Sequence, residues 1–188
     1  MVLRLIAVLA PFAIRELVHW RIAADSPRRR DGTSSGGEAS VWIWTAAYVA
    51  LLALATRAAW LDALWRSGWI GLPILWAGAA LRVSAYRALG SHYAATIRVH
   101  AQHVIVRSGP YRWLRHPLHL GLVLEMAGLA LAAPTPLALS LLAVALGVLV
   151  VRNVAEERVL IAGLGEPYRA YRASTWDPID WLPLGGRR

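Results

Sequence analysis

The chain has 188 residues, of which 57% are hydrophobic, with ten tryptophans, no cysteine and a net charge of +9. The absence of cysteine excludes disulfides, thiolate metal sites and cysteine nucleophiles. The basic residues stand between long apolar segments and form no stripe with interleaved aromatic residues, which excludes a soluble nucleic-acid-binding protein.

Five apolar segments follow one another along the chain, and each is compared with the ~20 residues that cross a bilayer. We expect transmembrane helices at about 2–20, 41–60, 69–88, 117–133 and 136–153. The first twenty residues fit either a signal peptide or a retained helix. The pair Arg15-Glu16 just beyond the weak cleavage match LAPFA favours the helix.

The sequence APTP at 133–136 separates the last two apolar segments. Two prolines in four residues break a helix, so we expect a tight helical hairpin over 117–153. The polar stretch 89–116 precedes this hairpin, and an amphipathic tail follows it. We therefore divide the chain into an N-terminal part, 1–88, with three transmembrane helices, and a C-terminal core, 89–188.

The arginines are distributed unevenly about these segments. With five spans, the 21–40 loop, the 89–116 loop and the C-terminal tail lie on one side, and they carry most of the arginines. The positive-inside rule places this side in the cytoplasm. The sequence predicts an all-α, multi-pass protein of the plasma (inner) membrane, surrounded by membrane lipids and without a nucleic-acid partner.

Two sets of ionisable residues flank the predicted hairpin. They are Arg112, Arg115, His116 and His119 at its start, and Glu156 and Glu157 just past its end. Because a hairpin brings its two open ends together, we expect these sets to meet at the cytoplasmic interface. Pro117 suits the first helical turn, so His116 lies near the N-cap, where the helix dipole favours an anion. Ordinary ion pairs with Arg152 or Arg115 would also explain the two glutamates.

A carboxylate also occurs within the fourth apolar segment. Glu125 lies eight residues after Pro117, where an ionised group in lipid is costly. We expect Glu125 either to pair with Arg82 or to line a polar cavity. Arg82 itself lies one turn from the end of the third segment, close enough to snorkel to the interface.

The order of residues in the second half of the chain resembles a known pattern. The chain has HVIVRSGPY at 103–111, RHPLHLG at 115–121 and EERVLIAGLGEPYRAY at 156–171. These stretches resemble the H-x-L-V-x-x-G-P-Y, R-H-P-x-Y-x-G and E-E-x-x-L-x-x-x-F-G-x-x-Y-x-x-Y blocks of the isoprenylcysteine carboxyl methyltransferase superfamily. These are integral-membrane enzymes that use S-adenosylmethionine. Val123-Leu124-Glu125 is similar to a bacterial branch that methylates alkylpyrones and alkylresorcinols.

The chain departs from the pattern at several positions, and an arginine often found after the second tyrosine of the tail has no clear match in RASTWDPIDWLP. His119 stands in place of a tyrosine, Leu118 in place of an asparagine of the bacterial branch, and Leu164 in place of a phenylalanine. These differences bear on the methyl acceptor more than on the cofactor.

The resemblance implies a cytosolic S-adenosylmethionine site built from the 89–117 loop and the C-terminal tail. The residues implied to bind the cofactor are His103, Val106, Gly109, Tyr111, Arg115, His116, Pro117, Glu156, Glu157, Tyr168 and Tyr171. Those implied to be catalytic are Arg115, His116 and Glu156, with Arg115 meeting the cofactor's carboxylate or orienting Glu156. His119 and Glu125 would contact the substrate, and no metal site is expected.

The reaction implied is methyl transfer from S-adenosylmethionine to an oxygen of a lipophilic small molecule that enters from the bilayer. An alkylpyrone or alkylresorcinol would gain from a general base, for which His116, His119 or a glutamate qualifies. Carboxyl methylation of an isoprenylated cysteine, which needs no base, is the alternative. A non-catalytic lipid-binding or transport protein is the third reading, and it explains neither the R-H-P block nor the acidic pair.

Overall fold

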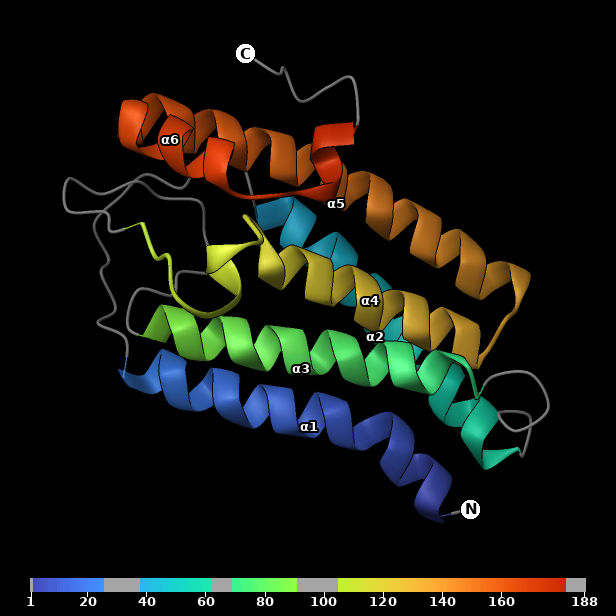
Figure 1. Ribbon diagram of the computed structural model, residues 1–188. Helices are drawn as coiled ribbons and strands as arrows, with labels where there is room; N and C mark the ends of the chain where they lie inside the picture. The colour runs from blue at the N-terminus through green and yellow to red at the C-terminus, as the bar shows by residue number, and fades with distance from the viewer. Residues whose placement is uncertain (1, 26–37, 62–68, 91–104, 182–188) are drawn as a thin grey trace.

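The computed structural model describes residues 2–25, 38–61, 69–90 and 105–181 (Figure 1). The helices are α1 (Val2–Asp25), α2 (Glu38–Trp60), α3 (Gly71–Leu89), α4 (Pro117–Ala132), α5 (Pro136–Leu164) and α6 (Glu166–Ser174), with short 3₁₀ helices η3 (Gly109–Arg112) and η4 (Pro178–Trp181). These described ranges contain no β-strand, so the prediction of an all-α fold is confirmed.

The helices alternate in direction, so that particular ends come together. Figure 1 shows the C-terminal ends of α1 and α3, the N-terminal end of α4 and the whole of α6 at one end of the bundle. The turn between α4 and α5 lies at the opposite end. The two residue sets that flank the predicted hairpin therefore lie at the same end of the bundle as α6.

Close packing of α3 against α4 is made possible by glycines spaced seven residues apart on each helix. They are Gly71 and Gly78 on α3, and Gly121 and Gly128 on α4. A Cβ atom at Gly78 would lie 2.6 Å from backbone atoms of α4, and one at Gly128 would lie 2.5 Å from the Leu75 nitrogen. Small residues let helix backbones approach this closely in membranes. Helix α3 belongs to the predicted N-terminal part, 1–88, and α4 to the predicted C-terminal core, 89–188. The two parts are therefore packed together in one hydrophobic core.

The break predicted at APTP is present. Helix α4 ends at Ala132, and α5 begins at Pro136, where the Thr135 hydroxyl caps the helix by accepting a hydrogen bond from the Ala138 N–H at 3.1 Å. Helix α5 then continues to Leu164, well beyond the predicted end at 153. Gly165 follows with a φ of +60°, a left-handed conformation suited to glycine, and the chain turns there into α6.

Within the described residues, α5 alone is long and apolar enough by itself to cross a membrane, whereas Thr45–Trp60 and Pro117–Ala132 are apolar but shorter. Leucine and valine side chains on the outer face of α5 are exposed, as lipid contact requires. At ~1.5 Å per residue, 29 residues exceed the ~30 Å hydrocarbon thickness, so the last turns of α5 extend beyond it. The count of five spans stays a prediction.

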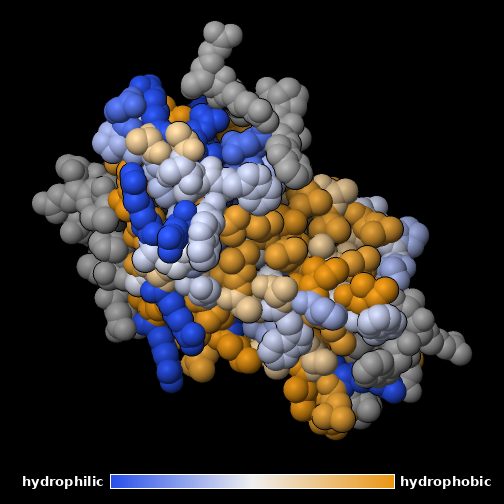
Figure 2. All heavy atoms as spheres, in the orientation of Figure 1, coloured by the Kyte–Doolittle hydropathy of each residue, from blue (hydrophilic) through white to orange (hydrophobic). Residues whose placement is uncertain are grey.

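Polar and apolar residues gather at different places on the surface. Figure 2 shows hydrophobic residues over the middle of the bundle, and hydrophilic residues concentrated at the end where α6 lies. The residue sets that flank the hairpin lie at this polar end, which is therefore where we place the candidate functional site.

Candidate functional site

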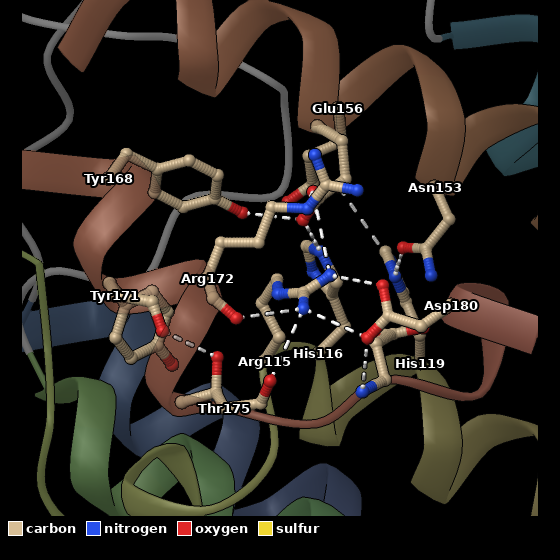
Figure 3. A network of polar contacts seen from close by, with 12 residues as sticks. Arg115, His116, His119, Asn153, Glu156, Tyr168, Tyr171, Arg172, Thr175 and Asp180 are labelled. Carbon is tan, nitrogen blue, oxygen red and sulfur yellow. Dashed lines mark hydrogen bonds and ion pairs between the residues drawn. The ribbon is translucent and has the colours of Figure 1, made fainter. Parts of the chain in front are cut away.

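The segment before α4 is bound to the C-terminal tail by backbone hydrogen bonds. Leu114 and Trp176 form an isolated parallel bridge, in which the Arg115 N–H donates to the Trp176 carbonyl at 2.9 Å. The Trp176 N–H donates in turn to the Trp113 carbonyl at 2.8 Å. The Tyr171 hydroxyl donates to the Tyr111 carbonyl at 3.0 Å. Loop and tail, about sixty residues apart in sequence, thus form one wall of the site (Figure 3).

Arg115 fastens this wall through its side chain. Its two terminal guanidinium nitrogens donate to the two carboxylate oxygens of Asp180 at 3.1 and 3.0 Å, a two-pronged ion pair. It also donates to the carbonyl of Arg172 at 3.1 Å and lies 3.5 Å from Oε2 of Glu157. Burial opposes the charged form, but Asp180 and Glu157 outweigh it, so the pKa of Arg115 is raised.

Glu157 is the centre of the buried ionic network. Its Oε1 accepts hydrogen bonds from Nε2 of His116 at 2.9 Å and from the hydroxyl of Tyr168 at 2.7 Å. Its Oε2 lies 3.5 Å from Arg115 and 3.3 Å from Nε of Arg172. Burial disfavours ionisation, but the hydrogen bonds and the neighbouring positive charges prevail and lower the pKa of Glu157 to about 2.

His116 is the N-cap residue of α4, as predicted, and its ring faces several negative charges. Burial opposes protonation of its ring. The hydrogen bond to Glu157 and the negative charges of Glu156 and Asp177 are stronger, so the pKa of His116 is raised. Because a carboxylate oxygen can only accept, the proton of this hydrogen bond lies on Nε2 of His116.

His119 and Glu156 form the more accessible part of the site. Nδ1 of His119 lies 2.5 Å from Oδ1 of Asn153, an oxygen that can only accept, so Nδ1 carries the proton. Nε2 of His119 lies 3.8 Å from Oε2 of Glu156, whose side chain is 24% exposed. The His119 ring stacks on His116 at 5.4 Å, and burial together with the neighbouring His116 lowers the pKa of His119, so the neutral ring is favoured.

The other residues that the resemblance implies in cofactor binding differ in how deeply they are buried. Tyr111, Pro117, Tyr168 and Tyr171 are buried beside the network, and Val106 is half-buried. Gly109 is exposed and has a φ of +57°, which starts the 3₁₀ turn before the bridge. His103 lies outside the described residues.

Two expectations about the arginines need correction. The carboxylates that Arg115 contacts are those of Asp180 and Glu157, so it does not orient Glu156. Arg82 does not snorkel: it is 8% exposed and donates to Glu125 at 3.0 Å, which confirms the pairing. Glu125 also accepts from Arg15 of α1 at 2.6 Å, a partner that the sequence did not indicate.

Three further residues of the site were missed. Asn153 lies one helical turn before Glu156 and on the same side of α5. This three-residue spacing is visible in the sequence and could have predicted that Asn153 belongs to the site. Arg172 and Asp180 come from a tail in which nothing in the sequence sets one charge apart from the next.

The fold and the site together define a helical protein with one long apolar helix and a buried ionic network at one polar end. The family model described as the isoprenylcysteine carboxyl methyltransferase (ICMT) family matches residues 69–162, half of the chain. The chain belongs to this family and is a membrane methyltransferase. The match runs from the start of α3 to the last turn of α5 and includes His116, His119, Glu156 and Glu157. The comparison with curated proteins gave no match.

Proposed function

We propose that the protein transfers a methyl group from S-adenosylmethionine to an oxygen of a lipophilic small molecule of the alkylpyrone or alkylresorcinol kind. The observation that carries this proposal is a neutral histidine ring, His119, beside an accessible carboxylate, Glu156, at the polar end of an apolar bundle.

The residues of the site fit the chemistry of S-adenosylmethionine, which carries a carboxylate, an ammonium and a sulfonium cation. Glu156 offers a partly exposed carboxylate to the positive groups. Arg107 and Arg112 are exposed guanidiniums stacked over Tyr171 and Trp113, and an arginine fork suits a planar carboxylate. Within the described residues, the buried Nε of Arg115 has no hydrogen-bond partner. The bound cofactor would supply an electrophilic methyl group.

The geometry separates positioning residues from residues that face the reactants. The guanidinium of Arg115 is paired with Asp180, and the carboxylate of Glu157 contacts His116, Tyr168 and Arg172. These two residues therefore hold the loop, the tail and α5 together. We assign to them the rigidity on which methyl transfer depends, because an in-line displacement is accelerated mainly by orientation.

His119 is the general base that we assign to the reaction. His116 keeps its proton through Glu157 and is therefore unsuitable. In His119 the proton sits on Nδ1, so Nε2 has the free lone pair that an enol or phenol proton requires. Glu156, 3.8 Å from this nitrogen, would stabilise the imidazolium that forms.

Carboxyl methylation of an isoprenylated cysteine is the second candidate. A carboxylate is already a nucleophile, and a base beside it brings no advantage. The base at His119, where the resembling pattern has a tyrosine, therefore favours an acceptor with a weakly acidic hydroxyl. A non-catalytic lipid-binding or transport role would leave the buried network at this end unexplained.

The orientation that we propose places the polar end and the C-terminus in the cytoplasm of a plasma-membrane protein with five spans. The concentration of arginines on the predicted cytoplasmic side supports this orientation. The lipophilic acceptor would reach His119 laterally from the bilayer, since its chain is soluble there.

The test is methyl transfer from labelled cofactor by purified protein in detergent containing a chelator. An alkylresorcinol and a farnesylcysteine analogue serve as competing acceptors. We expect label in the alkylresorcinol only, and a loss of at least a hundredfold in His119→Ala, as for a general base. The matched control is His19→Ala, a histidine of α1 beside Glu16. Label in the farnesylcysteine analogue alone would establish the second candidate, and absence of saturable cofactor binding by calorimetry would refute both.

A further inference from the structure

We propose that His116, His119 and Glu156 form a binding site for a divalent transition-metal ion, with Zn²⁺ as the best-suited species. One ring nitrogen of each histidine and one carboxylate oxygen of Glu156 all lie within 4.8 Å of one another. No metal site is expected from the sequence, in which Glu156 lies far from the two histidines, and the three residues meet only when α4 and α5 are folded together.

The donor types and the spacing suit zinc. Zn²⁺ binds imidazole nitrogen and carboxylate oxygen at about 2.0–2.2 Å, so neighbouring tetrahedral ligand atoms lie about 3.4 Å apart. Nε2 of His119 and Oε2 of Glu156 are already at 3.8 Å. Two imidazoles with one carboxylate are the ligand set of catalytic zinc sites, in which the fourth position is open.

The groups around the candidate ligands are those that a metal site needs. Ligating histidines are usually oriented by a hydrogen bond from the ring to a carboxylate or carbonyl oxygen. His116 has Glu157 as that partner at 2.9 Å, and His119 has Oδ1 of Asn153 at 2.5 Å. Glu157 and Asn153 are both 7% exposed, and Tyr168 fixes Glu157 in turn.

Local sequence explains how the ligands meet. In His116-Pro117-Leu118-His119 the two histidines are three residues apart, so they lie on one side of the first turn of α4, with rings stacked at 5.4 Å. Glu156 approaches from α5. His119 is one of the positions at which the chain departs from the pattern that it resembles, so the metal site is a property of this chain.

The consequence for methyl transfer is inhibition. A metal ion on His119 would occupy the nitrogen lone pair that the proposed function assigns to the base, so the ion and the acceptor proton compete. The metal site itself goes beyond the proposed function and does not depend on it.

The experiment uses full-length protein without a histidine tag, stripped with a chelator, in detergent, and titrated with Co²⁺ in the absence of cofactor and acceptor. Co²⁺ accepts the same ligands as Zn²⁺ and reports its coordination by visible absorption. We expect one equivalent of Co²⁺ to bind with a low-symmetry spectrum, and Zn²⁺ to displace it.

Four variants locate the ion. His119→Ala and Glu156→Ala should weaken Co²⁺ binding at least tenfold. Asn153→Ala should weaken it about 10- to 100-fold, because it removes an orienting partner. His19→Ala, which removes a histidine that also lies near a glutamate, should bind as the wild type does.

Two results would overturn the proposal: a wild-type protein without saturable Co²⁺ absorption, or a His119→Ala protein with unchanged affinity. If His119→Ala does not fold, His119→Gln is titrated in its place, with its thermal transition as the check. Methyl transfer is assayed separately in chelator, so failure of the metal site and failure of the proposed function give different results.

Discussion

Replacing Glu157 by glutamine removes one negative charge from the centre of the site with almost no change in shape. Glutamine can still accept from Tyr168 and His116 through one oxygen. It cannot neutralise His116, Arg115 and Arg172, which all lie within 3.5 Å of the carboxylate oxygens. We therefore expect Glu157→Gln to lose both stability and methyl transfer.

The size of the stability loss follows from two independent estimates. The pKa of Glu157 is about 2 in the folded protein instead of 4.5, a difference that corresponds to about 3 kcal/mol. Breaking a buried ion pair by removing one partner typically costs about 3–5 kcal/mol. In a chain of this length each 1 kcal/mol lowers the melting temperature by roughly 2–4 °C, so a decrease of about 6–20 °C is expected.

The assay is thermal unfolding of purified protein in detergent, with Glu156→Gln as the matched control. Glu156 is the preceding residue on α5, but its side chain is 24% exposed and lies 3.8 Å from a neutral histidine. We expect Glu156→Gln to melt within about 2 °C of the wild type, as surface substitutions do. Equal melting temperatures for the two variants would refute the conclusion that Glu157 is the centre of the network.

Three further predictions follow from the same coordinates. Gly78→Ala should lower the free energy of unfolding by about 1–3 kcal/mol, because its Cβ would lie 2.6 Å from the α4 backbone. The control is Gly147→Ala, whose Cβ would have nothing within 4 Å and which should leave the free energy of unfolding unchanged or raise it. Both are measured by unfolding in denaturant. Asp180→Asn should remove the ion pair that holds η4 to Arg115 and make this part of the tail more sensitive to limited proteolysis, and an unchanged cleavage pattern would contradict this. A lowered pKa means that Glu157 stabilises the fold fully above about pH 4.5 and loses this effect as pH falls to 2. The difference in melting temperature between wild type and Glu157→Gln, measured in chelator, should therefore shrink over that range.

The sequence predicted the parts of the fold that depend on local patterns. Hydropathy located the helices, and the prolines of APTP located the break between α4 and α5. Pro117 placed His116 at the N-cap of α4. The end of α5 was predicted too early, because Arg152, Asn153 and the glutamates looked like the end of an apolar segment. The helix continues to Leu164, and within this continuation Glu157 is bonded to His116 and to Tyr168 of the tail.

The candidate site was predicted by residue type and only partly by role. The predicted hairpin is present, and residues of the cationic and acidic sets meet at its open end, as expected. It could not say which glutamate points inward, since consecutive helical residues face directions about 100° apart and either one could be buried. The structure gives Glu157 the internal position and leaves Glu156 at the surface. The role of Asp180 could not be predicted from the sequence, because its partner, Arg115, lies 65 residues away in the chain.

The buried charges in the middle of the bundle show why tertiary partners limit such predictions. Glu125 is 1% exposed and bonds to Arg15 from α1 and Arg82 from α3, so three helices converge on one carboxylate. Each of these residues, seen alone, weakens the case for a transmembrane helix. Together they satisfy one another, and the cost of burying each charge becomes a constraint on which helices must be neighbours. Arg15, which looked like an interruption near the end of the first segment, is thus a polar contact that helps to join α1 to α4.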